Sequence, residues 1–287
     1  MDYMFSKIKR FTGVGLTSVF ALILTLTQTT YADDSYSVAK FKRSGRCVQC
    51  DLRYESFPDC KFANADLTGA YLFSTNFKKC LMVSAVLESA ILTNAQLQYA
   101  DLTRANLAKA SLQDANFHGA TLLGANLVFA NLNGAEFEAA ELSEADLTTA
   151  SMIGANMQNL FAINTQFRNA NMQRVILSHA KLDRANMEGA NLSGARLDHA
   201  SLTNTNFRNA KLQGASLSAA SLGFANLRYA NLKNAILTGA KLNGANLQNA
   251  NFSGADLSGV DLNGVFYEGA NFCDAKMPDG TLGTCKP

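Results

Sequence analysis

Residues 65–74 read ADLTGAYLFS and residues 245–254 read ANLQNANFSG, so one five-residue pattern returns far along the chain in the same frame. From Phe62 to Met277 every fifth residue is Leu, Phe or Met, except at Ala162 and Tyr267. The residue two positions before each of these is usually small, and it is Ala at 35 of the 44 positions. A period of five matches neither the 3.6-residue period of a helix nor the two-residue period of a strand. The pattern therefore excludes an ordinary amphipathic helix and an ordinary half-buried strand.

Two apolar positions that are two residues apart suit a short bridge that points both side chains inward and then turns. Four such bridges close a square coil of about 20 residues, and coils stacked at strand spacing, about 4.8 Å, pair their backbone groups. Residues 50–277 then form about 11 coils and a rod about 50 Å long. Gly and Asn, which are frequent at the fifth position, suit the corners of this coil.

One unit inverts the pattern, because Leu160 occupies the small position and Ala162 the large one. The exchange roughly conserves interior volume, as a close-packed axis requires. The alternative is a local bulge in the coil.

The pattern resembles the pentapeptide-repeat family, whose motif is A-(D/N)-L-x-x, and the resemblance covers residues 50–277. It implies an all-β fold, a right-handed quadrilateral β-helix. The run Cys47-Val-Gln-Cys50-Asp-Leu52 is similar to the C-x-x-C-D-L opening of exported members, and residues 277–281 resemble their closing M-P-D-G-T segment. Few activities are associated with the family, so the resemblance indicates the fold better than the function.

The first 32 residues have the order of a secretory signal peptide. Lys7, Lys9 and Arg10 precede an apolar run over residues 11–26, and Thr30-Tyr31-Ala32 offers small residues for cleavage before Asp33. The alternative is an uncleaved membrane anchor, but the apolar run is short for a span. We therefore expect export to the periplasm (or the thylakoid lumen of a cyanobacterium) or to the extracellular space, with no membrane span left after cleavage.

The exposed ends of a solenoid need caps. Residues 33–49 precede the repeats and include a segment, 34–45, that begins with Asp/Ser and stops at Gly, which favours a short helix. Residues 278–287 form the closing cap, where Pro278 and Gly280 end the coil.

Six cysteines follow the signal segment, and in an oxidising compartment paired cysteines are the default. Cys60 and Cys80 are one coil apart at the same inward position, within disulfide range. Cys273 and Cys285 both lie in the closing segment, which leaves Cys47 and Cys50 for each other. Fifteen pairings exist for six cysteines, and sequence alone does not choose among them. Cys60 and Cys80 also fit as small core residues, and Cys47/Cys50 as a redox or zinc pair that lacks a second C-x-x-C.

Residues that could carry chemistry are few. His179 and His199 are 20 residues apart, so they should stack on neighbouring coils with Asp198 beside them, which makes a weak candidate metal site. Two solvated imidazoles are the simpler interpretation, since a good site needs three or four ligands. No nucleophile has an identifiable base, and no phosphate-binding glycine motif is present, so we expect neither catalysis nor a cofactor.

The outward positions offer surfaces instead. Arg168, Glu188, Arg208 and Arg228 share one outward row on successive coils, which predicts a surface salt-bridge ladder. A second face is poor in charge and is a candidate docking wall, although amide ladders that help stacking explain it equally well. This candidate docking face contains Asn131, Asn133, Asn171, Gln173, Asn191, Asn231 and Asn251.

Charge separates the candidate functions. Without residues 1–32, the 25 Lys+Arg and 23 Asp+Glu of the chain fall to 22 of each, so the mature chain is formally neutral. We expect an exported, non-catalytic scaffold with flat faces for an unidentified protein or envelope component, and oligomers remain open. An alternative is a glycan- or envelope-binding module. A further alternative comes from the family, in which some cytoplasmic members resemble B-form DNA and inhibit DNA gyrase. That mimicry needs an acidic surface, so neutrality and export disfavour it, and neutrality also disfavours nucleic acid as a partner.

Overall fold

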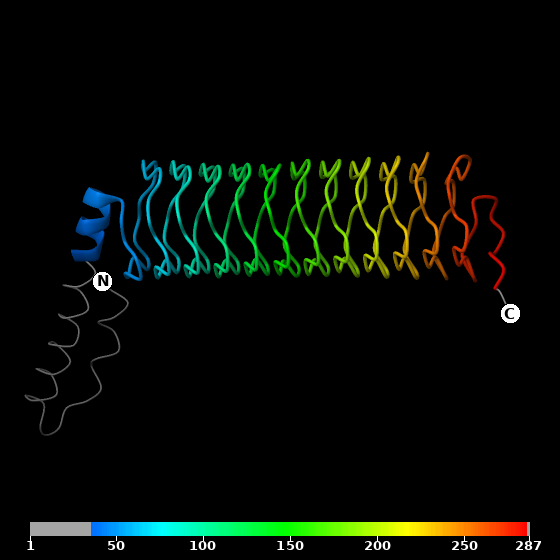
Figure 1. Cartoon of the computed structure of the whole chain (residues 1–287), viewed down its shortest axis with the longest axis horizontal. Helices are drawn as coiled ribbons and strands as arrows, with labels where there is room; N and C mark the ends of the chain where they lie inside the picture. The colour runs from blue at the N-terminus through cyan, green and yellow to red at the C-terminus, as the bar shows by residue number, and fades with distance from the viewer. Residues whose placement is uncertain (1–35, 286–287) are drawn as a thin grey trace, which may run out of the picture.

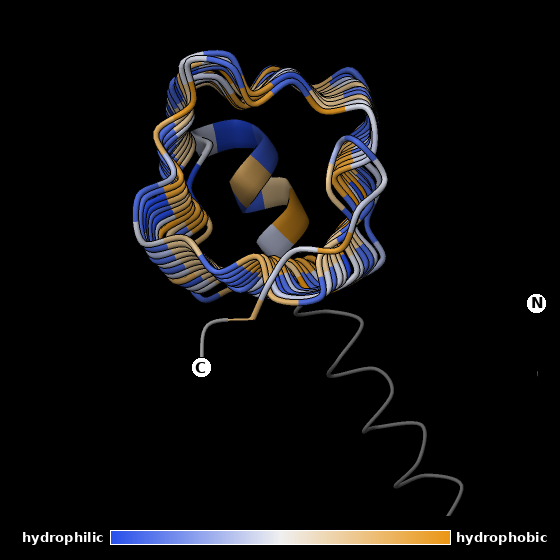
Figure 2. Cartoon of the chain, turned by 90° about the vertical axis from the view of Figure 1, so that its right-hand side faces the viewer, coloured by the Kyte–Doolittle hydropathy of each residue, from blue (hydrophilic) through white to orange (hydrophobic). Residues whose placement is uncertain are grey.

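The computed structural model describes residues 36–285 of the chain, so the predicted signal peptide lies outside the described residues. Apart from one antiparallel bridge at the C-terminal end, the β structure of the described residues consists of single parallel bridges that each join a residue to the one 20 positions later. This parallel series runs without a break from Arg46↔Asp66 to Asp256↔Lys276. One lap of the chain is therefore 20 residues, and the laps stack into a β-helix solenoid (Figure 1). Seen along its axis, the solenoid has four sides (Figure 2).

Each five-residue unit repeats the same roles, which residues 65–69 illustrate. Ala65 is the small residue, Asp66 the bridge residue, Leu67 the inner residue, Thr68 the outer residue and Gly69 the corner residue. The amide of Leu67 donates to the carbonyl of Val86 in the next coil (2.7 Å), and the amide of Asp66 donates to Gly45 in the preceding coil (2.9 Å). Neighbouring coils thus satisfy each other's backbone groups in both directions.

A tight turn follows every bridge. The amide of Ala70 donates to the carbonyl of Leu67 (3.0 Å), and the same bond recurs along the rod. Every corner residue from Gln49 to Asp274 has a positive φ, which is the signature of the third residue of a type II turn. This requirement explains why Gly and Asn are frequent there, because they adopt left-handed backbone at the lowest cost.

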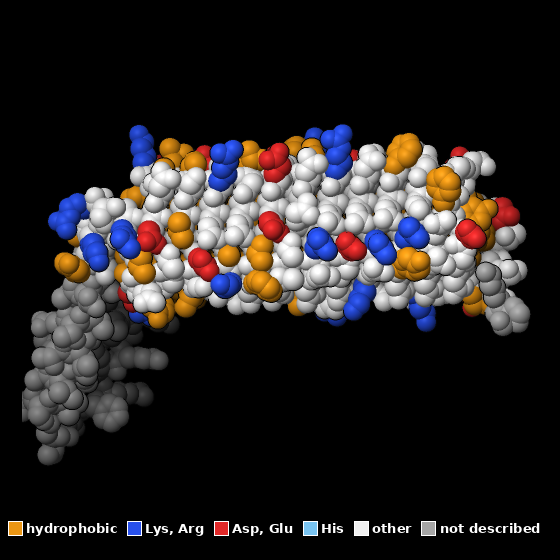
Figure 3. Space-filling model, in the orientation of Figure 1, with side chains coloured by type: hydrophobic (Ala, Val, Ile, Leu, Met, Phe, Trp, Pro, Cys, Tyr) orange, Lys and Arg blue, Asp and Glu red, His pale blue; other side chains and the backbone are white. Residues whose placement is uncertain are grey.

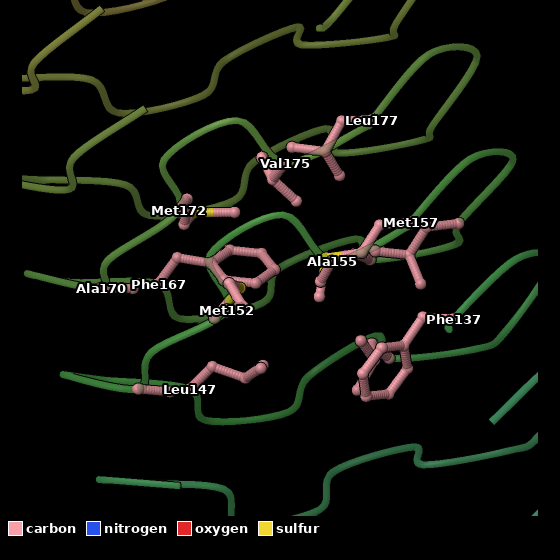
Figure 4. Close-up of a cluster of buried hydrophobic side chains, with 14 of the residues drawn as sticks. Phe137, Leu147, Met152, Ala155, Met157, Phe167, Ala170, Met172, Val175 and Leu177 are labelled. Carbon is pink, nitrogen blue, oxygen red and sulfur yellow. The ribbon is translucent and has the colours of Figure 1, made fainter. Parts of the chain in front are cut away.

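The small and inner residues fill the axis as the sequence predicts. They are buried along almost the whole rod, and the rings of Phe117 and Phe137 stack at a centroid distance of 4.5 Å. Inner side chains such as Met152, Phe167 and Met172 point into the same interior (Figure 4). Within residues 36–285 the core is therefore a continuous, mainly apolar column.

The inverted unit keeps its place in this column. Leu160 and Ala162 are both 0% exposed, and the bridge Phe161↔Lys181 preserves the 20-residue register between them. The bulge interpretation is therefore wrong. The exchange leaves the path of the backbone unchanged.

Threonine replaces alanine at three small positions and brings a hydrogen bond with it. The buried hydroxyls of Thr75, Thr165 and Thr205 donate to the carbonyls of the inner residues 23 positions earlier, at 2.7, 2.8 and 2.9 Å. A buried hydroxyl without a partner would destabilise the fold, so this bond is what makes threonine acceptable there.

Each end of the rod has its own structure. A helix spans residues 36–44, within the segment for which the sequence favours a short helix, and lies across the end of the square outline (Figure 2). Its Phe41 is fully buried, and the centroid of the Phe41 ring lies 4.2 Å from that of the Phe62 ring. At the other end Leu282 pairs antiparallel with Lys276, so the chain folds back over the last coil. Across residues 36–285, no helix is long and apolar enough to cross a membrane.

Candidate interaction faces

The bridge residues of this rod owe their identity to the turn that follows. The side-chain oxygen of a bridge Asp or Asn accepts the amide of the outer residue two positions on, as Asp146 does from Thr148 (2.9 Å) and Asn156 from Gln158 (3.2 Å). This contact satisfies an amide that the tight turn leaves without a backbone partner. The Asp/Asn preference of the repeat is therefore primarily structural.

The candidate docking face follows this rule. The bridge residues Asn131, Asn191, Asn231 and Asn251 each accept an outer amide, at 3.0 to 3.3 Å. The amide of Asn251 also donates to Asn231 at 3.5 Å.

The remaining members of this face are less uniform. Asn133 accepts from the hydroxyl of Ser151 (2.7 Å) and the amide of Ile153 (2.8 Å), so it also links coils. Asn171 has a buried side-chain oxygen with no partner among residues 36–285, and Gln173 lines a shallow surface hollow. The face is thus built largely from amides already committed to the fold.

A second amide row, which the sequence analysis did not single out, lies on a neighbouring face. Asn186 donates to Gln166 (3.1 Å), Asn206 to Asn186 (3.1 Å) and Asn226 to Asn206 (3.2 Å). We call Gln166, Asn186, Asn206 and Asn226 the amide ladder. The sequence does contain a signal for this ladder, because an Asn or Gln recurs every 20 residues at these four positions.

The predicted salt-bridge row beside this ladder forms only in part. Glu188 lies 3.8 Å from Arg168, but no carboxylate of the described residues comes within 4.0 Å of Arg208 or Arg228. The guanidinium groups of these two arginines instead lie near the ring of Tyr229, at 5.9 and 5.5 Å from its centroid. An aromatic face attracts a cation at such distances. Tyr229 is a corner residue, whereas Arg208 and Arg228 are outer residues, so the contact joins two different rows of the repeat.

The histidine pair stacks as predicted, with His179 and His199 parallel at a centroid distance of 5.0 Å. The carboxylate of Asp198 is engaged elsewhere, since it accepts from the hydroxyl of Ser216 and lies 3.9 Å from Arg196. In the described part of the chain, the three residues do not form a group whose ligand atoms converge. The geometry gives this candidate metal site no third ligand.

The six cysteines form three pairs in the structure. Cys47 lies beside Cys50, Cys60 beside Cys80 and Cys273 beside Cys285, with Cα–Cα distances of 5.3, 4.4 and 4.1 Å. Asp274 completes a group of ligand atoms with the last pair, but the two sulfurs would be thiolate ligands only if they were not bonded to each other. The first two pairs lie near the N-terminal end of the rod and the third lies at its C-terminal end.

Hollows are shallow on the described surface. A hollow of about 520 Å³ lies at the C-terminal end, lined by apolar residues including Leu262, Tyr267 and Phe272. Tyr267, one of the two exceptions to the large apolar pattern, is half exposed there. On the face that Figure 3 shows, charged side chains of both signs are scattered over a mainly uncharged surface.

Several carboxyl groups at turns and in ion pairs have lowered pKa values. The hydroxyl of Ser258 hydrogen-bonds Asp256 and lowers the pKa of its carboxyl, and Thr281 lowers the pKa of Asp279 in the same way. The pKa of Asp51 is lowered chiefly by the side chain of Arg53. These shifts favour the ionised form and therefore do not prepare a general acid.

Comparison with known proteins places this geometry among repeat proteins. A family model described as pentapeptide repeats matches eight copies, over residues 70–108, 110–148, 150–189, 185–223, 215–259 and 250–282. No curated protein matches the chain.

Several solved structures are similar to the chain. One is the pentapeptide repeat protein Rfr23 from the cyanobacterium Cyanothece 51142, at 31% identity over 40% of this chain and 92% of that one (TM-score 0.40). Another is HetL from the cyanobacterium Nostoc, involved in heterocyst differentiation regulation, at 28% identity over 86% and 97% (TM-score 0.29). A third is QnrB1, a plasmid-mediated fluoroquinolone resistance protein, at 19% identity over 77% and 91% (TM-score 0.30).

Proposed function

Since the chain belongs to the pentapeptide-repeat family, we propose that it is a non-catalytic interaction scaffold that works outside the cytoplasm. In this proposal residues 1–32 are a cleaved signal peptide, residues 33–49 and 278–287 are caps, and residues 50–277 form a right-handed rod of about 11 coils. Its partner is a protein or an envelope component that docks on a flat outer face.

The observation that carries the proposal is the character of the outer surface. Each coil presents its bridge and outer residues to solvent over four sides, while the interior is filled by apolar side chains. Such a rod offers long, regular faces with a fixed spacing, which suits binding over an extended area.

Export adds a role for the cysteine pairs. We take all three to be disulfides, because pairs of this kind persist in oxidising compartments and the ends of a solenoid are where fraying begins. The pair Cys60 and Cys80 then bonds two successive coils, and the pair Cys273 and Cys285 holds the folded-back end.

Fractionation of cells that produce the full chain tests the proposal. We expect the protein in the exported fraction, with a mass that corresponds to cleavage after Ala32 and no free thiols. A variant with Ala32→Tyr is the control, because a bulky residue at the cleavage point should block processing. An unprocessed wild-type chain in the cytoplasm would contradict the proposal. A supercoiling assay then tests the gyrase alternative, and inhibition at stoichiometric levels would favour it over an extracytoplasmic role.

A further inference from the structure

The amide ladder exposes hydrogen-bond donors and few acceptors. The side-chain oxygen of Asn186 accepts from Asn206 (3.1 Å) and from the amide of Glu188 (3.2 Å), and that of Asn206 accepts from Asn226 (3.2 Å) and the amide of Arg208 (3.2 Å). An amide oxygen has two lone pairs, so both oxygens are saturated. Each NH₂ group has two hydrogens, and the ladder uses one of them.

Uncompensated positive charge lies beside these donors. Arg208 and Arg228 are one coil apart, and within residues 36–285 neither has a carboxylate within 4.0 Å. The Nε atom of Arg228 is shielded from solvent and has no acceptor among those residues. Two guanidinium groups on neighbouring coils present several N–H donors, which suit an oxyanion.

An aromatic surface completes the cluster. Tyr229 is 46% exposed, and its ring adjoins both guanidinium groups. Both arginines are therefore positioned along the rod surface by packing on this ring, which lowers the entropic cost of ordering them around a ligand.

From these contacts we infer that Arg208, Arg228, Tyr229 and the free N–H groups of Asn206 and Asn226 form a binding site for an acidic sugar unit of a linear glycan. The oxyanion of the sugar binds between the arginines, its ring packs on the tyrosine, and neighbouring hydroxyl oxygens accept from the ladder. The inference deepens the proposed interaction role by naming a ligand class.

Two features distinguish this ligand from other anions. Glu188 and Glu268 occupy the same outward row on either side of the two arginines, so a uniformly charged polyanion such as nucleic acid would meet repulsion at both ends. An acidic peptide would bring backbone N–H groups that need acceptors, and the ladder offers few, because the side-chain oxygens of Asn186 and Asn206 are both saturated. A sugar acid brings one charge and many acceptor oxygens.

Calorimetric titration of the purified full chain with trigalacturonate tests the inference. We expect binding that weakens as salt is added, and little binding of the neutral methyl ester of the same trisaccharide. A sulfated trisaccharide distinguishes carboxylate from sulfate as the preferred oxyanion. The double variant Arg208→Gln/Arg228→Gln should lose at least about tenfold in affinity, since charge-assisted hydrogen bonds are the strong ones. Tyr229→Leu should lose a smaller factor.

The matched control is Arg104→Gln/Arg174→Gln, which removes the same charge from exposed corners outside the site. We expect it to bind within about threefold of the wild type. Thermal unfolding checks that each variant folds, and the two single variants substitute if the double variant does not. Failure of the wild type to bind either acidic trisaccharide, or equal loss in the site and control variants, would overturn the inference. Neither result would bear on export, which fractionation measures separately.

Discussion

Exchanging Leu160 and Ala162 tests how the core of this rod is specified. Both side chains are fully buried, with alanines one coil away on either side of Leu160 and leucines on either side of Ala162. Leu160→Ala removes three buried carbons, worth about 2.4 kcal/mol of transfer free energy, and a cavity term brings the loss to about 3–4 kcal/mol. Ala162→Leu alone adds the same volume to a filled axis and should cost about 1–3 kcal/mol.

The double variant restores the regular order of the repeat. It should lie within about 1.5 kcal/mol of the wild type, because total volume is conserved, which implies a coupling of at least about 2 kcal/mol between the two positions. Urea unfolding followed by circular dichroism measures all four proteins, compared at a common slope. A double variant whose loss equals the sum of the single losses would refute compensation. The inversion would then be an isolated feature of this coil.

Three further outcomes follow from the structure. In thermal unfolding, Gly119→Ala should destabilise the protein more than Gly154→Ala. Both glycines have positive φ, but only at Gly119 would the added Cβ lie within 2.6 Å of a tyrosine ring. Equal losses of stability would show that the ring moves away freely. Cys60→Ala/Cys80→Ala should lower stability by about 3 kcal/mol, the chain-entropy value for a loop of this length, and an unchanged melting temperature would mean that the pair is not bonded. The pKa of Asp256 is lowered from 3.8, mainly by a serine hydroxyl, so its contribution is complete at neutral pH and lost as the pH falls through the depressed folded-state value. Asp256→Asn keeps the hydrogen-bond acceptor but does not titrate. The melting temperature of this variant should therefore fall less than that of the wild type between about pH 5 and about pH 2, and an equal fall in both proteins would contradict this role of Asp256.

The architecture was predictable because it depends on a local rule repeated many times. Each five-residue unit contains a small residue, a large residue and a corner residue that tolerates positive φ. Because four such units close one coil, the 20-residue register follows from the repeat itself. The inversion at Leu160 and Ala162 was interpretable for the same reason, since volume can be summed along the sequence.

The surface was harder to predict because its chemistry depends on how side chains share partners between coils. The sequence placed His179 and His199 together, but not the engagement of Asp198 by Ser216. It also placed Arg208 and Arg228 in one row, but the ring that both contact lies in a corner, on a different row. The side-chain oxygens of Asn186 and Asn206 are saturated by turn amides and by neighbouring side chains. Such sharing depends on the three-dimensional arrangement and cannot be inferred from the sequence.

Spin-label distances give the most direct test of the 20-residue lap. All six native cysteines are paired, so labels attach to introduced ones. Ser151→Cys with Asn231→Cys spans four bridged steps, and Ile91→Cys with Asn251→Cys spans eight on the same face. At strand spacing the account predicts separations of about 19 and about 38 Å, a ratio of two. Distances that do not scale with the number of steps would contradict the stacked coil itself.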